Sequence, residues 1–458
     1  MTLAAATPVQ ISRRSSPFAR QSVERAHVHV LGVLLLLAAH VPLALVMFQQ
    51  PSIARVHALA TIALGVAWAV SRKPLGQLAI VAAYIAGADV LWRMVRAPIF
   101  WESGKYAVIL IFFLAIQRTR PLRTTNFPVI FFALLVPAAL LTIANIEPDR
   151  SVRRALAFNL SGPLALAVCV AFFSRVHLST IQVKRLLVAF LGPSVGVLAV
   201  CVFSVARAEE ILFKMESNRL FTGGFSPNQV SSALGCGAMV AFLLALLCAT
   251  RQERILRYLM FLLAVVLAAQ SALTFSRSGL YLAVISSCVG AAYMLRDARS
   301  RTRVLCGVCF VYVIGAYVVI PRLDAFTENR LSRRFSERHL TGRDRLMLAD
   351  LDLWWKNPIL GAGPGMGYAH RAGFAREAAA AHCELTRLAG EHGLLGIAAI
   401  GLLLHAAWRA MQGRASPPLR AVCAAMLAFS LLYMGATAMR LLLPSFTFGL
   451  AFASFEHE

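Results

Sequence analysis

Charged residues are scarce in this sequence, and acidic residues are scarcer than basic ones. Asp, Glu, Lys and Arg make up 14% of the 458 residues, against about 25% in an average soluble domain. Hydrophobic residues make up 59%, and the mean hydropathy is +0.69. Repeated apolar runs of roughly 17–22 residues match a ~30 Å hydrocarbon layer at 1.5 Å per residue. The composition therefore excludes a soluble protein and predicts an all-α polytopic membrane protein.

Three further features are missing. The nine cysteines include one Cys-x-x-Cys pair, Cys306 and Cys309, but this pair and most of the others fall inside apolar runs, so neither a disulfide framework nor a thiolate metal site is indicated. No carboxylate cluster has metal-ligand spacing, so the sequence predicts no metal and no other cofactor. The first apolar run is already of span length, which is not typical of a cleavable signal. Residues 1–27 are predicted to form a disordered, basic cytoplasmic tail.

The apolar segments predict twelve to fourteen transmembrane helices, because the fourth segment is short and the last contains Pro444. We divide the chain into the tail 1–27, a helical bundle 28–320, a loop 321–393 and C-terminal helices 394–458. The predicted spans are 28–48, 53–70, 75–95, 105–117, 127–144, 155–173, 186–206, 229–249, 255–273, 279–295, 304–320, 394–410, 421–437 and 440–455.

The net charge of +24 is better explained by membrane topology than by nucleic acid binding, because Lys and Arg gather in cytoplasmic loops. If the N-terminus is inside, 207–228, 274–278 and 321–393 lie outside. Alternate connections are basic, as this orientation requires: Arg72 and Lys73; Arg118, Arg120 and Arg123; Arg175, Lys184 and Arg185; Arg251, Arg254 and Arg257; Arg296, Arg299, Arg301 and Arg303; Arg409, Arg414 and Arg420.

The predicted outer loops are basic as well, which the topology rule does not explain. An anionic ligand on the outer leaflet would explain the excess, and pairing with the acidic residues of the long loop would explain part of it; we expect both. The basic residues are Arg207, Lys214, Arg219, Arg322, Arg330, Arg333, Arg334, Arg338, Arg343, Arg345, Lys356, Arg371, Arg376 and Arg387.

Two short segments that are predicted to lie outside carry residues that could bind a phosphate group. In 218–228, Arg219 precedes a Gly-Gly turn and a Pro-Asn helix start, which offers a guanidinium beside free helix N–H groups, although such residues also make ordinary turns. In 274–279, Arg277 lies at the membrane boundary with no carboxylate nearby in sequence. A snorkelling arginine would lie there too, but an ionisable group at this depth is favoured to be functional.

The longest polar interval runs from Thr341 to Ile400 and contains a glycine-rich run, 361–367, which allows close approach to a ligand. His382 lies beside Glu384 in a polar, span-adjacent position, where a histidine can accept a proton at neutral pH. His339, His370 and His392 are weaker candidates in the same interval, and the histidines in or near the spans are better explained as structural.

The motifs then occur in a recognisable order: Arg-x-x-x-Gly-Gly-x-x-Pro-Asn (219–228), Ser-Arg-Ser-Gly (276–279), Gly-Arg-Asp to Gly-Ala-Gly (342–363) and Ala-His-Cys-Glu-Leu to Glu-His-Gly-Leu-Leu-Gly (381–396). This order resembles the O-antigen ligase and polymerase superfamily over residues 200–400. The resemblance implies a GT-C-like multispan bundle in the bacterial inner membrane with its site facing the periplasm. One departure is Cys383, where relatives often carry Asn.

The resemblance implies glycan transfer from undecaprenyl pyrophosphate to a lipid A–core acceptor. It implies His382 as the base and Arg219 and Arg277 as the groups that stabilise the pyrophosphate. Pyrophosphate leaves without protonation, so we expect one metal-independent displacement with inversion. The predicted substrate-binding residues are Arg219, Arg277, Arg343, Asn228, Gly363 and Glu384.

Alternative functions stay open at this point. An O-antigen polymerase would use a second lipid-linked repeat as acceptor, and a protein O-oligosaccharyltransferase would use a Ser or Thr side chain. The ligase is favoured because the glycine and histidine loop is compact and no large domain follows the twelfth span. A transporter or flippase of anionic glycolipid would explain the outer arginines too, but it would not need the loop histidine, and no internal repeat is evident.

Overall fold

The computed structural model is an all-α polytopic membrane protein and describes residues 29–122, 125–146, 151–213, 216–337, 342–374, 380–413 and 416–455. Among these residues, eleven helices are long and apolar enough to cross a membrane. The strands found in the described ranges, β1 (His177–Leu178) and β2 (Ser454–Phe455), form one short parallel pair. The predicted fold class is therefore confirmed. The predicted tail, 1–27, lies outside the described residues.

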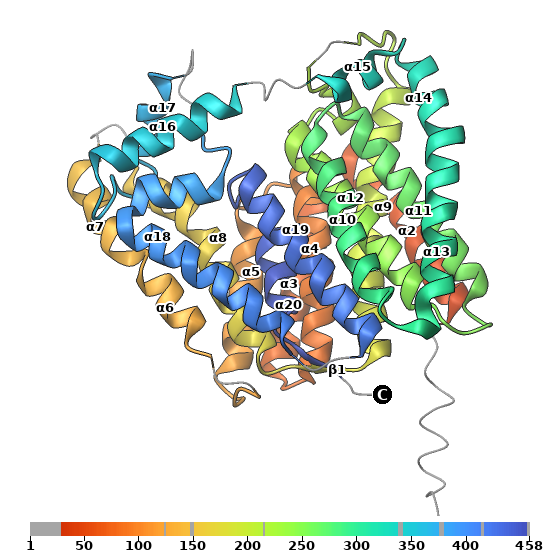
Figure 1. Ribbon diagram of the computed structural model, residues 1–458, viewed down its shortest axis with the longest axis horizontal. Coiled ribbons are helices and arrows are strands. Elements are labelled where there is room, and N and C mark those ends of the chain that lie inside the picture. Colours follow the sequence, from red (N-terminus) through yellow and green to blue (C-terminus); the bar gives the residue numbers. More distant parts are fainter. Residues whose placement is uncertain are drawn as a thin grey trace, which may run out of the picture.

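The long helices pack into one bundle (Figure 1). In chain order they are α2 (Val30–Gln49), α3 (Pro51–Val70), α4 (Leu75–Met94), the kinked pair α6 (Phe127–Ala133) and α7 (Val136–Asn145), α8 (Val152–Phe173), α9 (Thr180–Ala206), α10 (Pro227–Leu247), α11 (Arg254–Leu273), the continuous α13 (Ala298–Val313), η2 (Ile314–Val319) and α14 (Ile320–Phe326), α18 (Glu384–Met411) and α19 (Pro417–Ala436).

Three of the predicted spans are not among these eleven long apolar helices. α5 (Ser103–Ile116) has 14 residues, and α20 (Leu443–Leu450) has eight. α12 (Arg277–Met294) has 18 residues but begins with an arginine and contains several serines. The remaining elements are short or extramembrane: η1 (Leu220–Thr222), α15 (Arg330–Ser336), α16 (Arg343–Lys356) and α17 (Gly367–Ala372).

The connections separate into two ends of the bundle, as the alternation of loops predicted. At one end the backbone N–H of Asn218 donates to the carbonyl of Thr274 over 3.0 Å, which joins two of the predicted outer loops. At the opposite end the N–H of Leu122 donates to the carbonyl of Ser174 over 2.9 Å, beside the β1–β2 pair. α15, α16 and α17 lie at the first end and β1 at the second (Figure 1).

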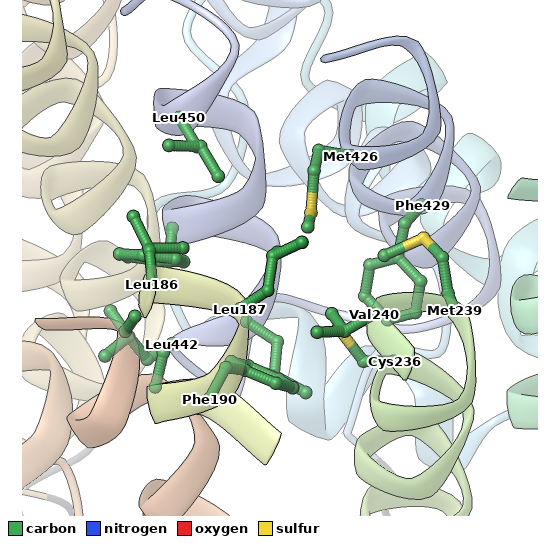
Figure 2. Close-up of a cluster of buried hydrophobic side chains, with 14 of the residues drawn as sticks. Leu186, Leu187, Phe190, Cys236, Met239, Val240, Met426, Phe429, Leu442 and Leu450 are labelled. Carbon is green, nitrogen blue, oxygen red and sulfur yellow. The ribbon is translucent and has the colours of Figure 1, made fainter. Parts of the chain in front are cut away.

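α10 is the centre of the bundle, because every residue in its apolar window is buried. Apolar side chains of α9, α10 and α19 meet beside the link to α20, as Figure 2 shows for Phe190, Met239, Phe429 and Leu442. By contrast, only 11% of the apolar window of α13–α14 is buried, so this long helix lies at the periphery.

A close helix crossing brings the start of α12 onto α10. A Cβ built on Gly235 would lie 2.1 Å from the carbonyl oxygen of Gly279, and a Cβ on Gly279 would lie 2.0 Å from that of Ser231. Small residues permit such backbone contact in membrane helices. The hydroxyl of Ser231 also donates to the carbonyl of Ser276 over 2.8 Å. The N-termini of the two helices are thus held side by side.

Candidate active site

A cavity of about 730 Å³, called here the main cavity, opens at the end of the bundle that carries α15 and α16. It is lined by residues of the 207–226 connection, α10, α12, α15, α16, α19 and the two links that precede α12 and α18. The lining residues are Glu216, Ser217, Asn228, Ser276, Arg277, Ser278, Tyr281, Leu282, Ile285, Arg334, Glu337, Arg343, Leu346, His382, Leu432 and Ala436.

Four helix N-termini face this cavity. Asn228 lies in the first turn of α10, Arg277 begins α12, Arg343 begins α16, and His382 lies two residues before the start of α18. Each N-terminus carries unsatisfied N–H groups and a partial positive charge, so an anion is stabilised there. Because four helix N-termini meet at this cavity, this end of the otherwise apolar bundle can bind an anion.

Asn228 joins three of these helices. Its side-chain Oδ1 accepts a hydrogen bond from Ser276 Oγ at 2.7 Å and another from Arg343 Nη2 at 3.2 Å. Arg343 is contributed by a helix more than a hundred residues away in the chain, so this amide fixes the position of α16 against α10 and α12. The arrangement holds a guanidinium in the cavity wall before any ligand binds.

Basic side chains dominate the wall. Arg277 donates to the backbone carbonyl of Glu337, and Arg334 forms an ion pair with the Glu337 carboxylate at 3.0 Å. Burial, together with the neighbouring charges of Arg277 and Arg334, lowers the pKa of the Arg343 guanidinium from its ordinary value. Like charges this close are costly without an anion, so the cluster favours a ligand with more than one negative charge.

His382 is held by its neighbours on both sides. The Nη2 of Arg440 donates to the carbonyl of Ala381 over 2.8 Å, and the backbone N–H of Met439 donates to Glu384 over 3.0 Å. Burial, and then the charges of Arg440, Arg343 and Arg371, lower the pKa of His382 from 6.5 to about 4. The imidazole is therefore neutral at pH 7 and able to accept a proton.

The floor of the main cavity is apolar. Leu282 and Ile285 come from α12, and Leu432 and Ala436 come from α19, which packs along α12. Tyr281, at the same level of α12, is partly exposed at the outer surface of the bundle. The cavity therefore combines a cationic upper part with an apolar lower part between two membrane helices, which suits an amphiphilic ligand with an anionic head.

A second cavity of about 440 Å³ lies on the other side of a thin wall. Two chain segments make this wall. In 380–382, Ala381 lines the second cavity and His382 the main one; in 436–440, Ala436 lines the main cavity and Arg440 the second. Its lining residues are Ser151, Arg154, Ala155, Phe158, Asn159, Gly365, Tyr368, Arg371, Ala380, Ala381, Arg387, Glu391, Ala438 and Arg440.

Of the predicted site residues, His382, Arg277, Arg343 and Asn228 line the main cavity, and Arg219 does not. The side chain of Arg219 is exposed, and its carbonyl accepts hydrogen bonds from the Gly224 N–H and the Thr222 hydroxyl, which close the turn before α10. Arg219 lies two residues from the lining residue Ser217, so it is at the mouth of the cavity rather than inside it.

Gly363 lies close against other parts of the protein, and its role in substrate binding stays a prediction. A Cβ at Gly361 would lie 2.3 Å from the carbonyl carbon of Glu391, and one at Gly363 would lie 2.6 Å from the Thr142 hydroxyl. Both glycines also have positive φ, of 72° and 99°. The glycine run is needed because the loop passes close to α7 and α18.

Glu384 belongs to a buried network, and its role in substrate binding stays a prediction. Its carboxylate is fully buried, forms an ion pair with Arg387 and accepts the Met439 N–H. Arg387 pairs in addition with Glu391 at 2.8 Å. The network joins α18 to the α19–α20 link, and that link is part of the wall that carries His382. Glu384 therefore acts on the site through backbone position.

Three contributors to the site were not singled out from the sequence. Arg334 and Glu337 form the pair that lines the cavity, but they were counted only within the basic loop. Arg440 was placed inside the last predicted span, although an arginine there is itself a signal of function. Of the other candidate bases, His370 pairs with Asp352 over 2.8 Å, His392 is fully buried in α18, and His339 lies outside the described residues.

No family model and no curated protein matches this chain. Among the described residues, no three His, Cys, Asp or Glu side chains are grouped as a metal ion would need. The function proposed below therefore rests on the geometry and charge of the two cavities.

Proposed function

We propose that the chain is a glycosyltransferase that moves a glycan from undecaprenyl pyrophosphate to a lipid A–core acceptor, the reaction of an O-antigen ligase. One observation carries the proposal: His382, Arg277, Arg343 and Asn228 share a cavity whose floor is apolar and lies between two membrane helices. We place the enzyme in the bacterial inner membrane with the main cavity facing the periplasm. The basic loops at the opposite end favour this orientation.

The donor's parts match the two halves of the main cavity. Its pyrophosphate would lie against Arg277 and Arg343, near the N-termini of α10, α12 and α16, where charge-assisted hydrogen bonds are strongest. Its polyprenyl chain would leave along Leu282 and Leu432 between α12 and α19. The glycan, being polar, would extend toward the open end. Arg219 would then meet the donor only at the cavity mouth.

The reaction is a single displacement at the anomeric carbon. An acceptor hydroxyl attacks that carbon while His382 accepts its proton, and a new glycosidic C–O bond forms. The bond between the anomeric carbon and the pyrophosphate oxygen breaks with its electron pair, which leaves undecaprenyl pyrophosphate. Arg277 and Arg343 stabilise the charge that develops on the leaving oxygen. The activated donor supplies the driving force, and the configuration inverts.

In a two-substrate reaction the acceptor must reach His382 by a route separate from that of the donor. The second cavity could provide this route. The 380–382 and 436–440 segments contribute residues to both cavities, and Arg154 and Arg440 line the second one. A phosphorylated acceptor such as lipid A–core would be attracted to these cations. A neutral serine or threonine acceptor would gain nothing from them. This favours the ligase over a protein O-oligosaccharyltransferase.

The proposal is tested by reconstitution in liposomes with an undecaprenyl-pyrophosphate glycan and one acceptor at a time. The acceptors are lipid A–core, a second lipid-linked repeat and a Ser/Thr-rich periplasmic protein. We expect glycan on lipid A–core alone, read by gel shift and mass spectrometry. Glycan on the second repeat would replace the ligase with a polymerase. Movement of the donor between leaflets without transfer to any acceptor would replace both with a flippase.

A further inference from the structure

α16 has two apolar faces, and only one of them is covered by protein. Leu346, Ala349 and Leu353 recur at helical spacing and are buried where α16 packs on α18. On the opposite side, Leu348 is 57% exposed and Leu351 is 42% exposed. Trp355 completes this second stripe at 79% exposed. A helix on a water-covered surface would carry polar residues on that side.

The exposed stripe continues into the outer surface of a membrane helix. The chain after α16 passes Ile359, and the carbonyls of Pro358 and Ile359 accept the N–H of Leu394 at 2.8 and 3.1 Å. Leu394 begins the second part of α18, after the non-helical Gly393. From Leu394 the exposed residues Ile397, Gly401, Leu404 and Trp408 repeat at intervals of three and four residues, which is one face of the helix.

That face of α18 is a bilayer contact, because the chain is a polytopic membrane protein and the face is apolar and exposed over the length of a span. After Lys356 and Asn357, the stripe on α16 is followed by Pro358, Ile359 and Leu360, which are apolar and exposed and lead to that face of α18. α16 itself lies across the end of the bundle above α18 (Figure 1). Its outer face therefore lies where the hydrocarbon region ends.

We infer that α16 is an interfacial helix that inserts Leu348, Leu351 and Trp355 into the leaflet next to the main cavity, so that its partner is the lipid bilayer. Tryptophan favours the boundary between headgroups and acyl chains. Arg345 and Lys356 flank the stripe at the two ends of α16, and Lys356 also pairs with Asp352 at 2.9 Å. Both side chains are exposed, so they can meet lipid phosphates. An in-plane amphipathic helix has this distribution of residues.

Insertion of α16 into the bilayer would also position the main cavity. This effect does not depend on which reaction the cavity performs. Arg343 begins α16 and is bonded to Asn228 in the main cavity. A bilayer that holds the outer face of α16 also fixes the height of Arg343 relative to the leaflet. The cationic end of the cavity would then lie at the level of lipid phosphates, so that a lipid-borne ligand reaches it without leaving the membrane.

The test measures which medium contacts Trp355. The wild-type chain and Trp355→Phe are placed in nanodiscs, which leave both faces open to solvent, and their tryptophan emission is subtracted. Brominated phospholipids quench from the hydrocarbon side and iodide quenches from water. We expect lipids brominated near the headgroup to remove at least about half of the Trp355 emission, and iodide to remove little. Trp355→Phe is a conservative change at an exposed position, so the fold is kept.

Two matched controls calibrate the measurement. Trp408→Phe removes an exposed tryptophan on the lipid-facing side of α18, so its difference spectrum should respond to brominated lipid. Trp92→Phe removes one that is 1% exposed, so its difference spectrum should respond to neither quencher. Quenching of Trp355 by iodide alone would show that the stripe faces water. Quenching by neither would show that another protein surface covers it, and both results overturn the inference.

Discussion

The low pKa of His382 makes the pH dependence of transfer unusual for a histidine base. Burial and three arginines lower this pKa to about 4, from the ordinary 6.5. A base with the ordinary value would be only about one-tenth neutral at pH 5.5, whereas a base with a pKa of 4 stays more than about nine-tenths neutral. Transfer should therefore continue at full rate well below pH 6 and fall only as the pH approaches 4.

The assay is kcat/KM for the lipid-linked donor from pH 4 to 8, because this ratio reports ionisations in the free enzyme. Binding of pyrophosphate should raise the pKa of His382, so the acidic fall in kcat should occur at a higher pH than the fall in kcat/KM. His370→Ala is the control, since His370 pairs with Asp352 outside the main cavity, and it should leave both curves unchanged. A fall in kcat/KM centred between pH 6 and 7 would show that the catalytic base titrates with an ordinary histidine pKa.

Three further outcomes follow from the contacts. Arg277→Ala should lower kcat/KM by about 10²–10³-fold, and Arg277→Lys by much less, because the lysine keeps the charge beside the leaving oxygen; equal and mild effects would mark Arg277 as an interface anchor. Glu384→Ala should cost about 3–5 kcal/mol of stability, seen as a lower Tm in detergent, since it removes one partner of the buried Arg387; an unchanged Tm with lost glycan binding would support the substrate-binding role. Gly279→Ala should cost about 1–3 kcal/mol and lower transfer, because its Cβ would meet Ser231, whereas Gly401→Ala, with nothing within 4 Å, should change neither Tm nor transfer.

The architecture could be predicted from the sequence because it depends on composition over long windows. Apolar runs of span length and alternating basic connections gave the fold class and the division of loops between two ends. The differences arise where a helix is short or carries a charge. α5 has 14 residues, α20 has eight, and α12 begins with Arg277, so none of the three is among the eleven long apolar helices.

The sequence also pointed to several groups that the fold brings into one cavity. His382, Arg277 and Arg343 were candidates because a polar or charged side chain next to a membrane span is costly to bury and is therefore often functional. Asn228 stood out from its place after a proline at a helix start. Their common feature is a helix N-terminus, and four helices that begin at the same end of a bundle bring such residues together.

Pairings between distant segments could not be predicted in this way. Gly363 is explained by Thr142 in α7, and Glu384 by the N–H of Met439 in the α19–α20 link. Neither partner is near in sequence, and neither contact leaves a local pattern. The sequence pattern of a glycine run does not show whether the run approaches a ligand or another helix. The sequence around a buried carboxylate does not show whether it binds a sugar or an arginine.

The most direct test of the account compares donor binding with transfer in one variant, His382→Ala. Binding of the undecaprenyl-pyrophosphate glycan is measured by isothermal titration in detergent, and transfer to lipid A–core is measured in liposomes. We expect the donor Kd to change little, because Arg277, Arg343 and Asn228 remain, while the transfer rate falls by about 10²–10⁴-fold. Transfer at the wild-type rate, or loss of donor binding in a folded variant, would contradict the assignment of His382 as the base.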